Sequence, residues 1–405
     1  MIVFLNFKNI GEYEMGSPLT NVWDDSQQPG PKFASAAWLT HDANQWPEGY
    51  KPVGHRTETI DLNLPIKKQL RRINGTPVVL LLLPIYIHDI KDDSDTLHKI
   101  IKIFEPFPQV NFMFLNTWDL GHYEHVGFNA VDYIFDSVKD INSERLNFNL
   151  CNKYVIDAVK TKRPDVDAKF MSVYFNRIKH FNKQPTEHNA DKRSKHFLCL
   201  NNLEKKHRTF IVDRMPPEAS YVSYLEKGIA LQQDVTLSQN TLSQWQDSLP
   251  LNYYNDSYIN VVNETMHDFD VRSVIKQGGE NLSMQGHITE KSIKPIYFRQ
   301  LFLISGIVGA NNLMRDLGFK LFDNFIDYSF DTEPDPLLRL KKLYVEIKRL
   351  TDIDIADIHE YYNSTECQSI IEHNLTVYDT HCFNPTQDLL TKYNVGYTAP
   401  PEFKL

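Results

Sequence analysis

The first half of the chain contains three short runs of nearly continuous hydrophobic residues, each about as long as one β-strand. They are residues 1–7 (MIVFLNF), 76–84 (TPVVLLLLP) and 110–116 (VNFMFLN). Strands that are hydrophobic throughout are typical of a parallel sheet covered on both faces. The intervening segments 65–73 and 94–104 have the hydrophobic spacing of helices. This alternation predicts an α/β domain.

A second α/β pattern follows a polar stretch, 180–195, which has the composition of an exposed linker and comes after a helical-looking segment, 168–178. The hydrophobic pattern predicts four more strands, at 196–202, 220–225, 258–264 and 301–306. It predicts helices between and after them, at 204–215, 290–300, 310–318, 334–350 and 355–375.

We therefore expect an α/β protein with two Rossmann-like lobes, a central cleft and C-terminal helices. The expected domains are 1–185, on the acceptor side of the cleft, and 195–375, with a tail at 376–405 that packs back on the body. Ligands of open α/β sheets bind beyond the carboxyl ends of the strands. The functional side chains should therefore follow the predicted strands.

Composition narrows the possible functions. The 405-residue chain is 41% hydrophobic with a formal net charge of −9, so general disorder is excluded and a broad nucleic-acid-binding surface is disfavoured. Its four cysteines have no paired spacing, so the sequence predicts neither a zinc site nor a disulfide framework. Unpaired cysteines favour a cytoplasmic location. The longest hydrophobic segment, 78–87, is too short to cross a membrane, and the first residues do not resemble a signal peptide.

Four cationic or ionisable residues follow the strand predicted at 196–202. Asn201 lies at the end of this strand, and Lys205, Lys206, His207 and Arg208 fall in the first turn of the next helix. Cations are unfavourable at a helix N-terminus, so their presence indicates a bound anion such as phosphate. The alternative is an ordinary solvated basic face.

The segment 287–306 (HITEKSIKPIYFRQLFLISG) places charges directly before a hydrophobic strand. Thr289 is the expected N-cap of a helix, which puts Glu290 and Lys291 in the first turn and Lys294 one turn later. Glu290 suits the vicinal hydroxyls of a ribose, and Lys291 suits a phosphate. A surface helix with an ordinary Glu–Lys pair is the alternative.

Two carboxylates at predicted strand ends are further candidates. Glu264 ends the strand at 258–264, where it could accept hydrogen bonds from a ligand or cap the next segment. Asp119 follows the strand at 110–116 and is our preferred catalytic base. The other polar residues after strands of the first half are weaker candidates: Glu12, Glu14, Asp24, Asp25, His41, Asp42, His88, Asp89, His122 and His125.

The order of these motifs over residues 196–331 resembles the donor-binding half of GT-B glycosyltransferases. It is most similar to the α-1,3-fucosyltransferase group, whose signature has a Thr-Glu-Lys helix start before a hydrophobic strand. Uncharacterised bacterial and phage-encoded proteins have similar ITEKTFKPI and LGFKTFD segments, which here read ITEKSIKPI and LGFKLFD.

The resemblance implies a nucleotide-sugar-dependent glycosyltransferase with a GDP- or UDP-sugar as donor and no required metal. It assigns Glu290 to the ribose, Lys291 to the diphosphate, and Arg208, beside His207, to the diphosphate as well. The implied acceptor is a glycan or, given the phage-encoded relatives, a hydroxymethylated DNA base in the cytoplasm of the host cell. A non-catalytic nucleotide- or glycan-binding protein of the same fold is the alternative. The sequence leaves the sugar, the stereochemical outcome and the oligomeric state open.

Overall fold

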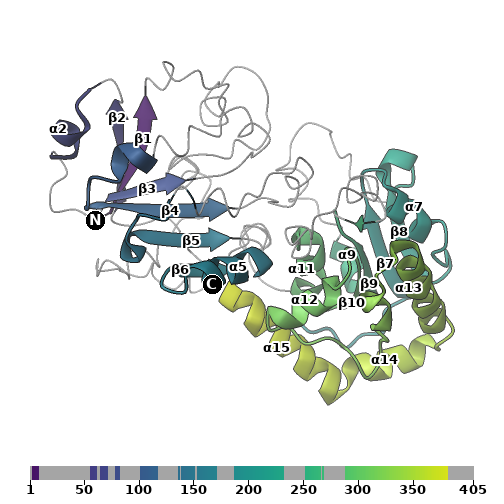
Figure 1. Cartoon of the computed structure of the whole chain (residues 1–405). Helices are drawn as coiled ribbons and strands as arrows, with labels where there is room; N and C mark the ends of the chain where they lie inside the picture. Colours follow the sequence, from purple (N-terminus) through teal and green to yellow (C-terminus); the bar gives the residue numbers. More distant parts are fainter. Residues whose placement is uncertain are drawn as a thin grey trace. The chain divides into compact units, whose positions relative to one another are not determined.

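The computed structural model describes twelve stretches of the chain: residues 2–8, 55–61, 64–71, 78–82, 101–116, 136, 138–150, 153–170, 187–231, 251–265, 267–268 and 288–381. The chain forms two compact units, with a boundary after Met171, and the second unit extends to Cys382. Each unit is built on one parallel β-sheet (Figure 1). The prediction of an α/β protein with two parallel sheets and C-terminal helices is confirmed.

The first unit has a six-stranded sheet in the order β2-β1-β3-β4-β5-β6, and every neighbouring pair of strands is parallel. Phe114 and Phe148 stack across β4 and β5 with ring centroids 4.7 Å apart, within a buried hydrophobic core. The elements of this unit are β1 (Ile2–Lys8), β2 (His55–Asp61), α2 (Ile66–Leu70), β3 (Val78–Leu82), β4 (Val110–Asn116), η6 (Ser143–Arg145), β5 (Leu146–Leu150), α5 (Lys153–Lys162) and β6 (Asp167–Phe170).

The second unit has a four-stranded parallel sheet in the order β10-β9-β7-β8. Its strands are β7 (Lys195–Asn201), β8 (Ser220–Tyr224), β9 (Ser257–Asn263) and β10 (Leu301–Ser305). The elements that join them are α7 (Lys206–Val212), η7 (Leu225–Lys227), α9 (Leu251–Asn255) and α11 (Glu290–Tyr297). The elements after β10 are α12 (Ala310–Asp316), η8 (Ser329–Thr332), α13 (Pro336–Thr351), α14 (Ile355–Asn363) and α15 (Thr365–His381).

The strand order of the second sheet defines a topological switch point between β7 and β9. The chain leaves β7 toward β8 on one side, whereas it leaves β9 toward β10 on the other side. The carboxyl ends of two such strands bound the crevice in which open α/β sheets bind ligands. Because α7 follows β7 and α11 precedes β10, the N-termini of both helices reach this same edge of the sheet.

Two local predictions differ from the structure. The segment 168–178 was expected to be helical, but its first residues belong to strand β6. The single helix expected at 355–375 is two helices, because Ser364 adopts an extended conformation between α14 and α15. Of the predicted tail at 376–405, residues 376–381 continue α15 and the remainder lies outside the described residues. Residues 187–194 of the predicted linker contain no helix or strand, and its last residue, Lys195, begins β7.

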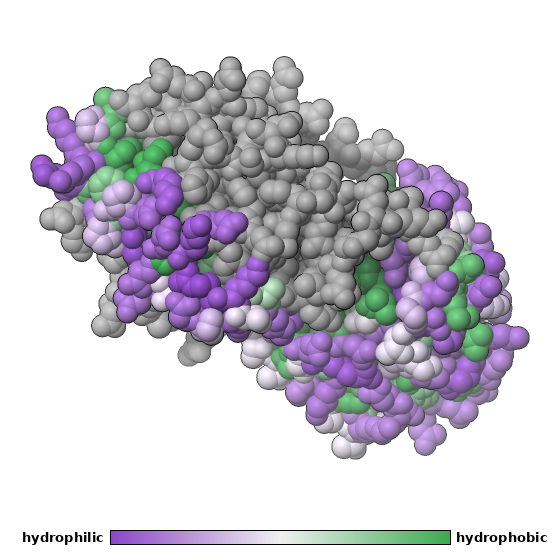
Figure 2. Space-filling view, viewed as in Figure 1, coloured by the Kyte–Doolittle hydropathy of each residue, from purple (hydrophilic) through white to green (hydrophobic). Residues whose placement is uncertain are grey.

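The described surface of the second unit is mostly hydrophilic on the face shown in Figure 2, with separate hydrophobic residues among the polar ones. Among the described residues of this unit, the large exposed hydrophobic side chains are Leu203, Ile229, Leu338 and Val345. In the part of the chain that the structure describes, no helix combines the length and hydrophobicity needed to cross a membrane.

Candidate functional site

The residues predicted to bind a nucleotide come together at the carboxyl edge of the second sheet. Asn201 is the last residue of β7, and Glu264 follows β9 directly, so these two residues flank the switch point. Thr289 is the N-cap of α11, as predicted, and its hydroxyl accepts a hydrogen bond from the backbone N–H of Lys291 (3.3 Å). The fold therefore gathers segments that are more than 80 residues apart in the sequence.

Glu264 is buried, with 1% of its surface exposed, and its carboxylate is fully engaged by protein donors. Oε1 accepts from the backbone N–H of Thr289 (3.0 Å) and from the Ser292 hydroxyl (2.5 Å). Oε2 accepts from the Thr289 hydroxyl (2.7 Å) and from the backbone N–H of Thr265 (2.9 Å). Four donors satisfy a buried charge that would otherwise be costly. Glu264 therefore ties the end of β9 to the start of α11.

The basic residues at the start of α7 hold the same loop from the other side. The backbone carbonyl of Glu264 accepts hydrogen bonds from Nε2 of His207 (3.0 Å) and Nη2 of Arg208 (3.3 Å). Both side chains are buried, and Arg208 also donates to the carbonyl of Leu203 (3.0 Å). Lys205 is half-buried and donates from Nζ to the carbonyl of Thr265. In this structure these residues support the loop after β9.

Glu290 and Lys291 form a half-buried ion pair at the start of α11. Nζ of Lys291 donates to Oε1 of Glu290 (2.7 Å) and to Oγ1 of Thr265 (3.0 Å), and the exposed fractions of the paired side chains are 27% and 28%. Burial alone would raise the pKa of Glu290, but the charges of Lys291 and the half-buried Lys294 outweigh it and lower the pKa to about 2. The site therefore keeps a carboxylate ionised beside two ammonium groups.

A row of buried polar side chains lies beneath the switch point. Nδ2 of Asn263 donates to Oδ1 of Asn201 (3.1 Å) and contacts the sulfur of Cys199 (3.4 Å). Among the described residues, Oδ1 of Asn263 and the hydroxyl of Ser305, its register partner on β10, have no hydrogen-bond partner. Buried polar atoms without a protein partner are unusual and indicate a place for a water molecule or a ligand group.

Sequence reasoning missed a buried charged cluster next to His207. The ring of His267 stacks on that of His207 with centroids 4.7 Å apart, and Nδ1 of His267 lies 3.4 Å from the carboxylate of Asp268. Asp268 in turn pairs with Arg339 of α13. Burial lowers the pKa of His267 well below its ordinary value, and the nearby charges of His207 and Arg339 act in the same direction. No local sequence pattern predicts this cluster, because Arg339 comes 71 residues after Asp268.

The other predicted site residues are placed as follows. Asp119, the predicted catalytic base, lies outside the described residues, as do the weaker candidates of the first half. Thr265 and Ser292 were not predicted, although each contacts a residue that was. Among the described residues, no group of three or more His, Cys, Asp or Glu side chains is arranged to hold a metal ion.

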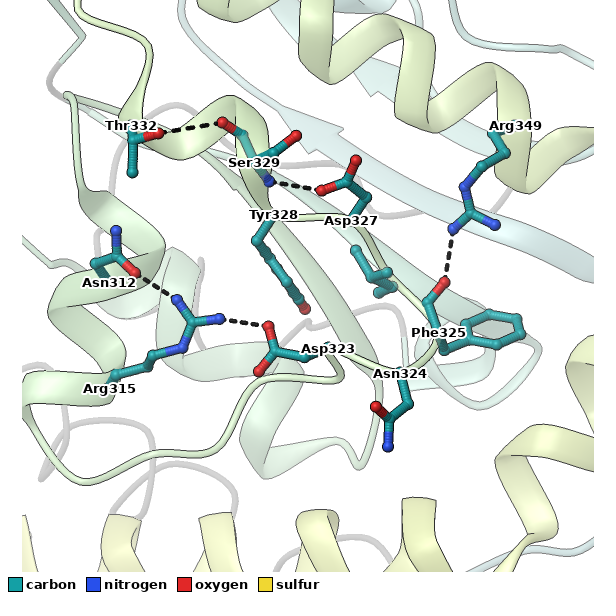
Figure 3. A pocket seen from close by; sticks show the side chains of 11 residues that line it. Asn312, Arg315, Asp323, Asn324, Phe325, Asp327, Tyr328, Ser329, Thr332 and Arg349 are labelled. Atoms are coloured by element: carbon teal, nitrogen blue, oxygen red, sulfur yellow. Dashed lines mark hydrogen bonds and ion pairs between the residues drawn. The ribbon is translucent and has the colours of Figure 1, made fainter.

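A separate open pocket of about 550 Å³ lies between α12, the loop before η8, and α13 (Figure 3). Arg315 pairs with Asn312 and Asp323 on one wall, and Arg349 donates to the carbonyl of Phe325 (2.6 Å) on the other. None of the predicted site residues lines this pocket. Its two guanidinium groups already bond to protein atoms, as do the cationic groups of the carboxyl edge.

Comparison of the chain with known proteins identifies no relative. No protein-family model, curated protein sequence or solved structure matches it. The functional assignment therefore depends on the sequence motifs and on the geometry of the carboxyl edge.

Proposed function

We propose that this protein is a glycosyltransferase that transfers a sugar from a nucleoside diphosphate sugar to an acceptor hydroxyl. The donor site is the carboxyl edge of the second sheet, at the switch point between β7 and β9. The observation that supports this most is the Glu290–Lys291 pair, which is half-buried at this edge on a helix start anchored by Glu264. It offers an acceptor for ribose hydroxyls beside a cation for the diphosphate.

The proposed reaction is displacement at the anomeric carbon of the donor sugar. The bond from this carbon to the diphosphate oxygen breaks, a bond to the acceptor oxygen forms, and a base takes the acceptor proton. Lys291, with Lys205 and Lys294 nearby, stabilises the negative charge that develops on the diphosphate. Asp119 remains our proposal for the base.

Arg208 has an indirect role in this proposal. The resemblance assigns an arginine to the diphosphate, whereas Arg208 here donates to two backbone carbonyls and is 3% exposed. We assign it the task of holding the loop at Glu264 and adding positive potential beneath the site. His207 supports the same carbonyl.

Two successive experiments, first nucleotide binding and then turnover, test the proposal. Thermal shifts with GDP, UDP, ADP and CMP should show stabilisation by at least one nucleoside diphosphate. The matching GDP- or UDP-sugar should then release free nucleoside diphosphate, faster when an acceptor glycan or hydroxymethylated DNA is present. Binding without turnover would indicate the non-catalytic alternative, and the absence of any nucleotide binding would overturn the proposal.

The variant Lys291→Ala locates the site. We expect it to lose about 1–3 kcal/mol of nucleotide-binding free energy, the range for a charge-assisted hydrogen bond. Lys341→Ala, at an exposed position of α13, removes the same charge away from the site and should leave the affinity unchanged. Equal affinities of the two variants would remove the site assignment.

A further inference from the structure

The ammonium group of Lys291 has no hydrogen-bond donor left for a ligand. It can donate three hydrogen bonds. The structure provides three acceptors: Oε1 of Glu290 (2.7 Å), Oγ1 of Thr265 (3.0 Å) and Oγ1 of Thr289 (3.4 Å). A diphosphate must therefore replace one of these acceptors before it can bind Lys291.

Two of the three acceptors are fixed by other contacts. The Thr289 hydroxyl donates to Glu264 (2.7 Å) and caps α11, and the backbone of Thr265 is held at its N–H by Glu264 (2.9 Å) and at its carbonyl by Lys205. Glu290 differs from the two threonines, because more than a quarter of its side-chain surface is exposed. Its contact with Lys291 is an ion pair and is the shortest of the three contacts. Its carboxylate is the acceptor that can move.

We propose that the diphosphate of the donor displaces the Glu290 carboxylate from Lys291, and that vicinal hydroxyls of the ligand then satisfy this carboxylate. This inference rests on the proposed function. A bare phosphate or pyrophosphate can displace Glu290 but has no hydroxyl pair to offer, so the carboxylate loses the hydrogen bond from Lys291, gains none from the ligand and lies beside a second anion. Glu290 is therefore a specificity-determining residue that selects nucleoside diphosphates against inorganic phosphates.

The two ligand types should respond in opposite directions when this carboxylate is neutralised. In Glu290→Gln, inorganic pyrophosphate no longer competes with an anion for Lys291, so we expect it to bind about three- to tenfold more tightly. The nucleoside diphosphate loses the charged acceptor of its hydroxyls, so we expect it to bind about five- to thirtyfold more weakly. A purely structural role of Glu290 would weaken both ligands together.

Isothermal titration of inorganic pyrophosphate and of GDP or UDP, at constant ionic strength, measures both affinities. Glu360→Gln, at an exposed position of α14, changes the net charge equally and should alter neither. Glu290→Ala should reproduce the gain for pyrophosphate if the glutamine variant folds poorly. Weaker pyrophosphate binding in these variants, with nucleotide binding intact in the wild type, would overturn the exchange and leave the proposed function standing. A wild-type protein that binds no nucleoside diphosphate would overturn both.

Discussion

The carboxylate of Glu264 holds Thr289 by two hydrogen bonds, one from the backbone N–H (3.0 Å) and one from the hydroxyl (2.7 Å). The Thr289 hydroxyl in turn accepts from the backbone N–H of Lys291 (3.3 Å). A chain of three residues thus connects the end of β9 to the cation proposed to bind the donor. Because Glu264 and Thr289 are both buried, packing as well as hydrogen bonding holds their side chains in place.

Replacing Glu264 with glutamine should destabilise the second unit. Both carboxylate oxygens accept hydrogen bonds, so an amide nitrogen at either position would face a backbone N–H donor. We expect a loss of about 2–4 kcal/mol in the free energy of unfolding, from the lost bonds and the donor left buried without an acceptor. Urea unfolding of this variant and of Glu360→Gln measures the difference. Equal unfolding midpoints would show that the four contacts of Glu264 contribute little.

The hydroxyl of Thr289 can be tested with an isosteric pair of variants. Thr289→Val keeps the shape but removes both the helix cap and one donor to Glu264, so we expect a loss of about 1–3 kcal/mol in the free energy of unfolding. Thr289→Ser keeps the hydroxyl and should lose less than about 1 kcal/mol. Thermal or urea unfolding measures both. A loss in Thr289→Val no larger than that in Thr289→Ser would show that the hydroxyl contributes no more than the methyl group and would contradict the capping role.

Most strands that sequence reasoning found, with β8 (SYVSY) as an exception, have nearly continuous hydrophobic runs. β4, β9 and β10 are of this kind, because both faces of their sheets are covered. The strands β2 (HRTETID), β5 (LNFNL) and β6 (DAKF) were missed. β5 is a buried interior strand with asparagine at alternate positions, whereas β2 and β6 lie at the two edges of the six-stranded sheet. Polar residues suit edge strands, which must avoid pairing with other chains. Their sequences therefore do not have the pattern of buried strands.

The candidate site was predictable where its signal is local. Thr289, Glu290 and Lys291 are consecutive, and a cap followed by charges before a hydrophobic strand predicts a helix start at a sheet edge. The engagement of Glu264 by protein donors was not predictable, because its partners Thr289 and Ser292 lie 25 and 28 residues away. A carboxylate at a strand end has the same sequence signature whether it binds a ligand or caps a helix.

The stability of the second unit should fall as the pH drops below about 6.5, the ordinary pKa of histidine. Burial lowers the pKa of His267 in the folded state, so the unfolded chain binds a proton that the folded chain does not. The contribution of His267 to the free energy of unfolding is therefore present above pH 6.5. It is lost on acidification, at up to about 1.4 kcal/mol per pH unit. Urea unfolding at several pH values measures this slope.

The variant His267→Gln isolates the contribution of this histidine. It has no titrating group at this position, so its free energy of unfolding should depend less on pH between 7 and 5 than that of the wild type. Identical slopes in His267→Gln and the wild type would assign the pH dependence to other groups.

Asn311 covers strand β10, which is one edge of the four-stranded sheet among the described residues, and its loss should both destabilise the second unit and promote aggregation. Its amide accepts from the backbone N–H of Ile304 (3.1 Å) and donates to the carbonyl of Ile304 (3.0 Å) on the edge strand β10. Asp331 holds the same amide (2.9 Å). Unpaired groups on an exposed edge are a template for pairing with a second chain.

We expect Asn311→Ala to lose about 2–4 kcal/mol in the free energy of unfolding, because it leaves the two backbone groups of Ile304 and the Asp331 carboxylate short of a partner. Light scattering during mild heating should show aggregation at a lower temperature than in the wild type. Asn312→Ala, whose side chain contacts Arg315 near the surface, should change either quantity only slightly. If the two variants aggregated at the same temperature, edge protection by Asn311 would be ruled out, and the free edge of β10 would have to be protected by other residues.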